Sequence, residues 1–325
     1  RTRTALVKRS YIRRRAAFAP RLRHQGETAL PSSPPVPRGG AAATKLTGVT
    51  DLVRVDLTGP AQTMLSTLYC KALDAGFERP VLGDTFAVKA VDRIDFDWSS
   101  LKIADMWTPL VTVRTAQYDI WASQFLAAHP HATVIHLGCG LDSRVFRLDP
   151  GPDVEWYDVD YPDVIDLRKQ VYPSRSNYHL VATSATDPSW LDEIPADRPT
   201  LLLAEGISMY LTQHDGVELL QHVVDRFPSG ELQIDFYNWV TVRTQKIQRL
   251  QRQSGSTLYW AVNSPDDVLR HVNGIRLLDA VTFFDASTFR RTSRAFRSAA
   301  RLMRPIRPLR GMLQYHRYAF GPLRL

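Results

Sequence analysis

A glycine-rich turn at residues 138–140 is the first place in this 325-residue chain where the backbone itself is suited to bind a ligand. It follows the apolar run Thr133–Leu137, and Gly138 and Gly140 permit a sharp turn and a close approach of the main chain to a small molecule. The third glycine of a dinucleotide fingerprint is replaced by Ser143, so the turn favours a nucleoside without a diphosphate. An ordinary strand-to-helix turn is the alternative interpretation.

Two acids follow the first glycine by about 20 residues, the spacing at which Rossmann-like sites place the carboxylate that binds ribose hydroxyls. Asp158 and Asp160 alternate at the end of a second apolar run. Either can instead cap the helix that starts near Pro162. We expect Asp160 to bind the ribose, and Asp158 suits either role equally well. A ribose carboxylate does not distinguish a nicotinamide cofactor from S-adenosylmethionine.

A third acid ends another apolar run. Glu205 is followed by Gly206, and at the carboxyl end of a strand this carboxylate lies where a cofactor and an acceptor meet. Negative charge at that point favours a cationic sulfonium over a neutral thioether. Tyr210 is a candidate for positioning the acceptor through a hydrogen bond, and packing within the turn is its alternative role.

An arginine interrupts the apolar stripe of a long helical stretch that we expect from about Lys102 to Ala128. The stripe places Arg114 on the same face as Trp107 and Trp121, which predicts a buried guanidinium. Such a group requires an anionic partner, and the helix itself does not show which anion that is. Pro109 lies inside the stretch and is expected to kink or split it.

Short apolar runs alternate with helical segments from residue 133 onward. We expect strands at 133–137, 154–159, 178–182, 201–204, 231–237, 276–284 and 313–320, with helices at 162–172 and 212–227. This alternation predicts an α/β fold with a doubly wound, mostly parallel sheet. In such sheets ligands bind at the carboxyl ends of the strands, where the motifs above are found.

The chain is expected to have three parts. Residues 1–48 mix Arg, Pro, Ser, Gly and Ala without periodicity, which predicts a disordered basic arm. Residues 49–130, with a further helix expected at 60–77, form an N-terminal helical cap, and residues 131–325 form the Rossmann-like domain.

The net charge of +8 is unevenly distributed. Residues 1–26 and 286–325 carry 19 of the 41 basic residues and no acid, so the central part of the chain is acidic. Nucleic-acid binding by the basic ends is the less favoured interpretation, because solvated basic arms are common. No run of eighteen apolar residues predicts a membrane span, and the Arg-rich N-terminus has no apolar region typical of a secretory signal. Two widely separated cysteines favour a cytoplasmic protein without a Cys-rich zinc site.

The chain from about residue 60 onward resembles the leucine carboxyl methyltransferase family, in particular its bacterial branch of tetracenomycin-type polyketide O-methyltransferases. The matching motifs, specific together and in this order, are G-D-T-F-A at 83–87, R-T-A-Q-Y-D at 114–119, I-H-L-G-C-G-L-D-S-R-V-F-R-L at 135–148, Y-D-V-D-Y-P at 157–162 and L-L-A-E-G-I-S-M-Y-L at 202–211. The resemblance implies a class I methyltransferase fold with seven strands, helices on both faces and S-adenosyl-L-methionine as the cofactor.

The resemblance also implies roles for individual residues. Arg114 matches the arginine that holds the methionyl carboxylate of the cofactor, which would supply its anion. The remaining cofactor contacts implied in this way are Lys71 near the same carboxylate, the backbone at Gly138, Asp160 at the ribose, and Glu205 after the fourth strand. Gly140 is a candidate contact from the glycine turn itself. The family's aspartate near the adenine is replaced here by Ser184, and Asp187 is the alternative if the register shifts.

The acceptor is expected to be a small molecule with a carboxyl or an already acidic hydroxyl oxygen. A carboxylate is ionised at neutral pH, whereas a phenol needs a general base. His136 is expected in the core and His214 on the surface, so neither suits that role. The resemblance adds that the acceptor belongs to the polyketide type.

Three other functions stay open at this stage. A nicotinamide-dependent oxidoreductase lacks support because neither the third glycine nor a suitable Tyr-x-x-x-Lys motif or catalytic His is present. A nucleic-acid methyltransferase lacks its N-P-P-Y motif. A catalytically inactive cofactor-binding protein is compatible with the same motifs, and the oligomeric state does not follow from the sequence.

Overall fold

The computed structural model describes residues 52–55, 60–103, 107–245 and 256–322. The basic arm expected at 1–48 lies outside these residues, so the proposed division into an arm, a cap and a catalytic domain stays a prediction.

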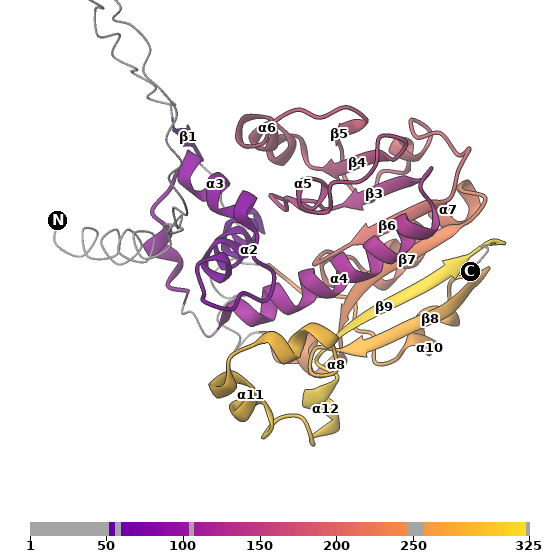
Figure 1. The fold of residues 1–325 in the computed structure, drawn as a ribbon. Coiled ribbons are helices and arrows are strands. Elements are labelled where there is room, and N and C mark those ends of the chain that lie inside the picture. The colour runs from indigo at the N-terminus through magenta and orange to yellow at the C-terminus, as the bar shows by residue number, and fades with distance from the viewer. Residues whose placement is uncertain (1–51, 56–59, 104–106, 246–255, 323–325) are drawn as a thin grey trace, which may run out of the picture. The chain divides into compact units, whose positions relative to one another are not determined.

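A seven-stranded sheet forms the centre of the fold (Figure 1). Its strand order is β5-β4-β3-β6-β7-β9-β8. The first five strands in this order are parallel, and β9 runs antiparallel to both of its neighbours. The strands are β3 (Thr133–Leu137), β4 (Glu155–Asp160), β5 (Tyr178–Ala182), β6 (Thr200–Ala204), β7 (Gly230–Tyr237), β8 (Ile275–Thr282) and β9 (Leu313–Phe320). The expected mostly parallel α/β sheet is confirmed.

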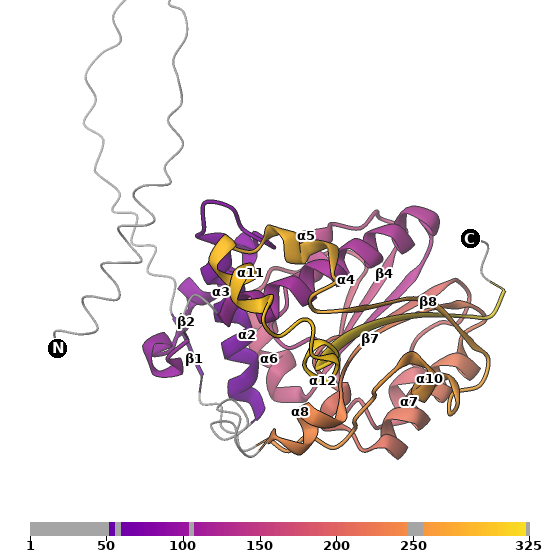
Figure 2. The same cartoon turned by 90° about the horizontal axis from the view of Figure 1, so that it is seen from below.

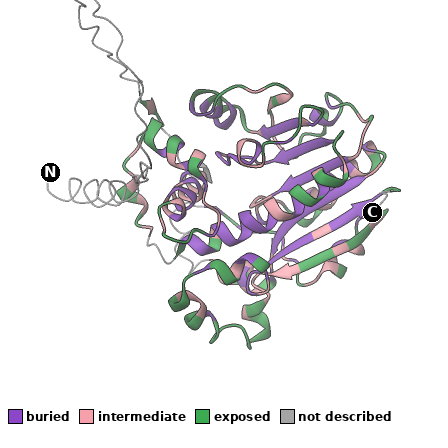
Figure 3. Ribbon diagram, viewed as in Figure 1, coloured by how far each residue is buried: buried purple, intermediate pink, exposed green. Residues whose placement is uncertain are grey.

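Alternating side chains of the strands pack into two cores, one on each face of the sheet. In β3, Val134 packs with α4 on one face, while Ile135 and Leu137 pack with α7 on the other. Helices therefore cover both faces, and the central strands β3, β6 and β7 are almost entirely buried (Figure 3). The edge strand β8 is partly exposed, which fits its position beyond the antiparallel β9.

The helices and minor elements lie between and before the strands. They are β1 (Val53–Arg54), α2 (Pro60–Ala75), α3 (Thr85–Arg93), β2 (Ile94–Asp95), η1 (Trp98–Leu101), α4 (Thr108–Ala128), α5 (Arg144–Leu148), α6 (Pro162–Val171), η3 (Pro188–Leu191), η4 (Ser208–Tyr210), α7 (Gln213–Arg226), α8 (Trp239–Arg243), α10 (Pro265–Leu269), η6 (Ser287–Arg291), α11 (Arg294–Ala300) and α12 (Arg307–Arg310). None of the described helices is long and apolar enough to cross a membrane.

Two expectations about the helices were wrong. The long helix begins at Thr108 rather than Lys102, because Pro109 occupies its first turn, where a missing N–H leaves no bond unmade. Proline therefore starts this helix instead of kinking it, and Trp107 and Leu110 are exposed rather than part of a buried stripe. The second difference lies in the Arg-rich region between β8 and β9. It folds into η6, α11 and α12, which the sequence did not predict (Figure 2).

Candidate cofactor and acceptor site

A cavity of about 2290 Å³ lies at the carboxyl ends of the parallel strands. Its lining includes the loops after β3, β4 and β6, together with residues of α2 and the first turns of α4. Parallel strands bring the ends of distant chain segments together at one edge, so residues from 63 to 313 meet there.

The backbone conformation of the turn after β3 requires glycine. Gly138 has φ of +62° and donates its N–H to the carbonyl of Val159 at 2.8 Å. A Cβ at this position would lie only 2.2 Å from the Cγ2 atom of Ile207. Gly140 has φ of +49° and donates its N–H to the Asp160 carboxylate at 2.7 Å. Both glycines line the cavity, and the second one links the turn directly to β4.

Asp160 lies at the cavity wall. Its Oδ2 accepts the N–H of Gly140, and its Oδ1 accepts the N–H of Tyr161 at 2.8 Å. Burial raises the pKa of Asp160, although these backbone N–H groups oppose the shift. Each carboxylate oxygen carries two lone pairs, so acceptor capacity remains for a hydroxyl pair in the cavity.

Asp158 does not line the cavity and caps no helix, so both of its expected roles are corrected. Its side chain is fully buried and forms an ion pair with Arg168. It also accepts hydrogen bonds from Trp156 Nε1 at 2.9 Å and from Tyr178 Oη at 2.6 Å. Burial by itself would raise the pKa of Asp158, but the Arg168 guanidinium together with His136 and the Tyr178 hydroxyl outweighs it and lowers the pKa. Asp158 is a core residue. Both acids lie on the same face of β4, and only Asp160, the last residue of the strand, reaches the cavity.

Arg114 is buried at the cavity wall between two carboxylates of the chain. Its Nε donates to Glu205 Oε1 at 3.0 Å and its Nη1 donates to Asp235 Oδ2 at 2.8 Å. Asp235 is fully buried in β7 and also accepts the N–H of Gly206 at 2.7 Å. Glu205 and Asp235 thus supply the anionic partners that the buried Arg114 requires. Sequence reasoning missed Asp235, because no local motif marks it.

Glu205 is held by three side chains. Besides Arg114, its carboxylate accepts a hydrogen bond from Thr115 Oγ1 at 2.7 Å and forms an ion pair with the fully buried Arg144. Burial by itself would raise the pKa of Glu205, but Arg144 and Arg114 outweigh it, and the pKa falls to about 2. Glu205 is therefore a permanent negative charge at the cavity.

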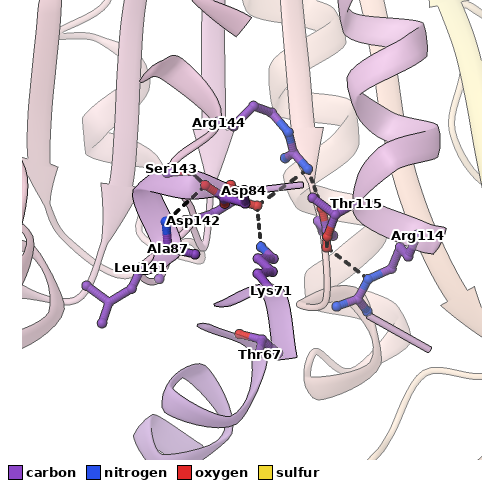
Figure 4. Close-up of polar contacts among 12 residues, drawn as sticks. Thr67, Lys71, Asp84, Ala87, Arg114, Thr115, Leu141, Asp142, Ser143 and Arg144 are labelled. Carbon is purple, nitrogen blue, oxygen red and sulfur yellow. Dashed lines mark hydrogen bonds and ion pairs between the residues drawn. The ribbon is translucent and has the colours of Figure 1, made fainter. Parts of the chain in front are cut away.

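Lys71 is buried in α2 and is not a solvated helix lysine. Its Nζ atom donates to Asp142 Oδ2 at 2.6 Å, and Figure 4 shows it pointing toward the loop after β3. Arg147 extends the cluster by ion pairs to Asp142 at 3.1 Å and to Asp84 at 2.8 Å. The N-terminal helices are tied to the glycine loop by these buried charges.

The two residues expected near the adenine do not line the cavity. Asp187 instead caps η3, where its carboxylate accepts the N–H of Ser189 at 3.0 Å, and Ser184 bonds to Thr186. Thr183 and Ala185 line the cavity at this point. The chain bends and turns at residues 183–186 after β5, which places Thr183 and Ala185 at the cavity but neither Ser184 nor Asp187.

Tyr210 lies in η4 and lines the cavity, as expected for a residue that faces an acceptor. Burial raises its pKa, so its hydroxyl stays protonated at neutral pH. His136 is buried with its Nε2 3.1 Å from Arg144 Nη1 and its Nδ1 3.3 Å from Asp158, and His214 is exposed on α7. Both histidines are where the sequence placed them.

Comparisons with known proteins agree with this geometry. The model of the leucine carboxyl methyltransferase family matches residues 75–224. The tetracenomycin polyketide synthesis O-methyltransferase TcmP of Streptomyces glaucescens is 42% identical over 232 residues, which cover 71% of this chain and 86% of TcmP. The chain belongs to the leucine carboxyl methyltransferase family.

Further relatives support the same assignment. The S-adenosyl-L-methionine-dependent methyltransferase dpfgK of Gibberella zeae is 35% identical over 70% of this chain and 83% of its own length. A crystal structure of a putative methyltransferase from Thermobifida fusca superposes with a TM-score of 0.52 at 15% identity, covering 78% of this chain and 94% of that one, which shows the shared fold. As a member of this family, the chain is an S-adenosylmethionine-dependent methyltransferase, and the nicotinamide alternative is not supported.

Proposed function

We propose that this methyltransferase transfers the methyl group of S-adenosylmethionine to a carboxyl oxygen of a bulky aromatic acceptor of the polyketide type. The name of TcmP assigns that relative to polyketide synthesis and to O-methylation, and the present chain spans 86% of its length. The buried free thiols of Cys70 and Cys139 are in keeping with a cytoplasmic enzyme.

The donor set at the cavity fits the cofactor. Asp160 offers acceptor capacity to a ribose hydroxyl pair, and the glycine turn lets the backbone approach the methionyl portion. Arg114 donates from Nε to Glu205 and from Nη1 to Asp235. Among the described residues, its Nη2 atom has no acceptor. Its Nη2 atom is therefore our candidate for binding the methionyl carboxylate.

The observation that carries the proposal is that three titratable residues lining the cavity, Glu205, His136 and Tyr237, are poorly suited to act as general bases. Glu205 has a pKa of about 2 and is held by two arginines, which makes it a poor proton acceptor. His136 faces Arg144 and Asp158 with its two ring nitrogens. Burial raises the pKa of Tyr237 to about 12, so it does not act as a phenolate at neutral pH. An acceptor that is already ionised needs none of these groups.

A carboxylate satisfies this requirement, because its ordinary pKa of about 4 leaves it charged at neutral pH. The bound sulfonium supplies an electrophilic methyl group for in-line displacement. The chain's own residues then have to align the acceptor and exclude water. Tyr210 and Tyr237, both protonated, are suited to donate hydrogen bonds to the acceptor.

The size and lining of the cavity favour a large aromatic acceptor. Its volume of about 2290 Å³ is more than twice the roughly 1,000 Å³ at the upper end for drug-sized ligand pockets. Trp107 and Tyr259 line it with 54% and 58% of their surface exposed, and Leu110 lines it with 39% exposed. Exposed apolar side chains that share one cavity mark a ligand-binding surface.

The test is the chemical nature of the methylated product. The full chain is incubated with methyl-labelled S-adenosylmethionine and either anthracene-2-carboxylate or 2-hydroxyanthracene, and the products are treated with mild alkali. We expect transfer to the carboxylate and release of labelled methanol, because esters hydrolyse and aryl ethers do not. Transfer to the hydroxyl compound alone, with an alkali-stable product, would refute the carboxyl assignment. Failure to bind S-adenosylhomocysteine would contradict the proposed methyl transfer and indicate a protein that is inactive or has another function.

A further inference from the structure

One wall of the cavity takes no part in the methyl transfer described above. It belongs to segment 283–312, which leaves the sheet after β8 and returns at β9 (Figure 2). Tyr237 pairs with Leu313 and Thr282 with Gln314, so both ends of the segment lie where the parallel strand β7 ends. The segment is thus anchored at the carboxyl edge of the sheet, beside the cavity.

The segment is strongly basic. It carries eight arginines and a single acid, Asp285. Asp285 is already paired with Arg304 at 2.9 Å and with Arg310 at 2.8 Å. Four other arginines of the segment line the cavity, and none of them has a carboxylate partner among the described residues: Arg290, Arg291, Arg294 and Arg297.

The contacts that these arginines make leave part of their charge available. Arg291 donates to the carbonyl of Val81 at 3.3 Å, and Arg297 donates to the carbonyl of Arg290 at 2.9 Å, so both bind neutral acceptors. Arg290 and Arg294 are exposed at the cavity, and the part of the chain that the structure describes offers their guanidinium groups no acceptor.

Two described carboxylates that line the cavity, Asp74 and Glu78, form no ion pair with these arginines. Asp74 lines the cavity, but its two oxygens accept the backbone N–H groups of Val81, Leu82 and Gly83 at 2.9–3.0 Å. Apolar side chains accompany the arginines, because Phe296 and Met303 line the cavity from the same segment. Uncompensated guanidinium groups beside apolar surface fit an anion carried on an aromatic body, since guanidinium binds acidic groups bidentately and stacks on rings.

We propose that Arg290 and Arg294 bind a second acidic group of the acceptor, separate from the carboxyl group that is methylated. This inference rests on the proposed function, because it describes the same acceptor. An arginine paired with the reacting carboxylate would withdraw charge from the attacking oxygen, so this wall suits a group that does not react. The acceptor class is therefore a polycyclic aromatic acid with an additional anionic substituent, such as an acidic phenol or a further carboxylate.

A pair of fluorescent probes that differ in one anionic group tests this inference. The full chain, saturated with S-adenosylhomocysteine, is titrated with 8-anilinonaphthalene-1-sulfonate and with its neutral counterpart N-phenyl-1-naphthylamine. The test variant is Arg290→Gln combined with Arg294→Gln. Arg301→Gln is the matched control, because Arg301 is exposed on the same segment and does not line the cavity.

We expect the double variant to weaken binding of the sulfonate about fivefold, as two partly exposed ion pairs predict, and to leave the neutral amine unchanged. Arg301→Gln should change neither affinity. The inference is overturned if the double variant leaves sulfonate binding unchanged, if Arg301→Gln weakens it equally, or if both probes lose affinity together. Calorimetric binding of S-adenosylhomocysteine separates the two claims. If the wild-type chain does not bind S-adenosylhomocysteine, the proposed function is contradicted. If it binds the cofactor product but the double variant binds the sulfonate as well as the wild type does, only the proposed role of the arginines is contradicted.

Discussion

Asp158 and Asp160 are two residues apart in β4, and neutralising each of them should have a different consequence. In Asp158→Asn, the buried Arg168 loses the charge that balances it. In Asp160→Asn, a carboxylate with a raised pKa is replaced by a neutral group of the same shape. The first change should lower the stability of the fold, and the second should weaken cofactor binding.

The magnitude for Asp158 follows from its partners. Removing one member of a buried ion pair typically destabilises a protein by about 3–5 kcal/mol. Arg168 keeps the carbonyls of Gly140 and Asp142, each 2.8 Å from its Nη1 atom, so we expect about 3 kcal/mol, the lower end. For a chain of this size that corresponds to a fall in Tm of about 6–12 °C. The pKa of Asp158 is depressed in the folded state, so this contribution is present above about pH 4 and is lost as the pH falls through the folded pKa.

Asp160→Asn should affect stability less than Asp158→Asn does. Its pKa is raised, so the folded state favours the protonated form and loses little when the charge is removed. We expect a stability loss of about 1–2 kcal/mol, because the asparagine amide can accept only one of the two backbone N–H groups that the carboxylate binds. Cofactor affinity should fall by about 1.5–3 kcal/mol, the range for a hydrogen bond to a charged group.

Urea unfolding and calorimetric titration with S-adenosylhomocysteine measure the two effects in the same pair of proteins. At a temperature well below its Tm, Asp158→Asn should bind S-adenosylhomocysteine with a Kd within about threefold of the wild-type value. This corresponds to a loss of binding free energy of no more than about 0.6 kcal/mol. The reasoning is refuted if Asp158→Asn is as stable as the wild type, or if it loses more cofactor affinity than Asp160→Asn does.

Three further predictions test other parts of the site and fold. Arg114→Lys should weaken S-adenosylhomocysteine binding by about 1.5–3 kcal/mol in calorimetry, because an ammonium cannot keep both carboxylates and still present a donor to the cofactor; an unchanged Kd would make the arginine purely structural. Tyr210→Phe should leave cofactor affinity unchanged and raise KM for the acceptor several-fold, roughly one lost hydrogen bond, and a changed cofactor Kd would contradict this. Truncation after Arg310 removes β9 from between β7 and β8 and should abolish cooperative unfolding in circular dichroism; a folded truncation would contradict the role of that strand.

Local patterns in the sequence were sufficient to place the glycine turn, Asp160 and Glu205 beside the cavity, because each of them lies at the end of a strand. The partners of these residues were not predictable in the same way. Asp235 lies 121 residues from Arg114 in the sequence, and the packing of α4 against β6 and β7 brings them together. Asp158 was ambiguous because period-two alternation puts Asp158 and Asp160 on the same face of the strand, so the pattern does not show which of them meets a buried arginine.

The pH dependence of methyl transfer tests the central claim most directly, namely that the acceptor arrives ionised and no side chain removes its proton. Single-turnover rates are measured with anthracene-2-carboxylate at saturating cofactor between pH 6 and 9. The rate should be flat over this range, because the acceptor carboxylate titrates near pH 4 and Glu205 near pH 2. A rate that rises with an apparent pKa between 6 and 9 would reveal a general base and contradict the account.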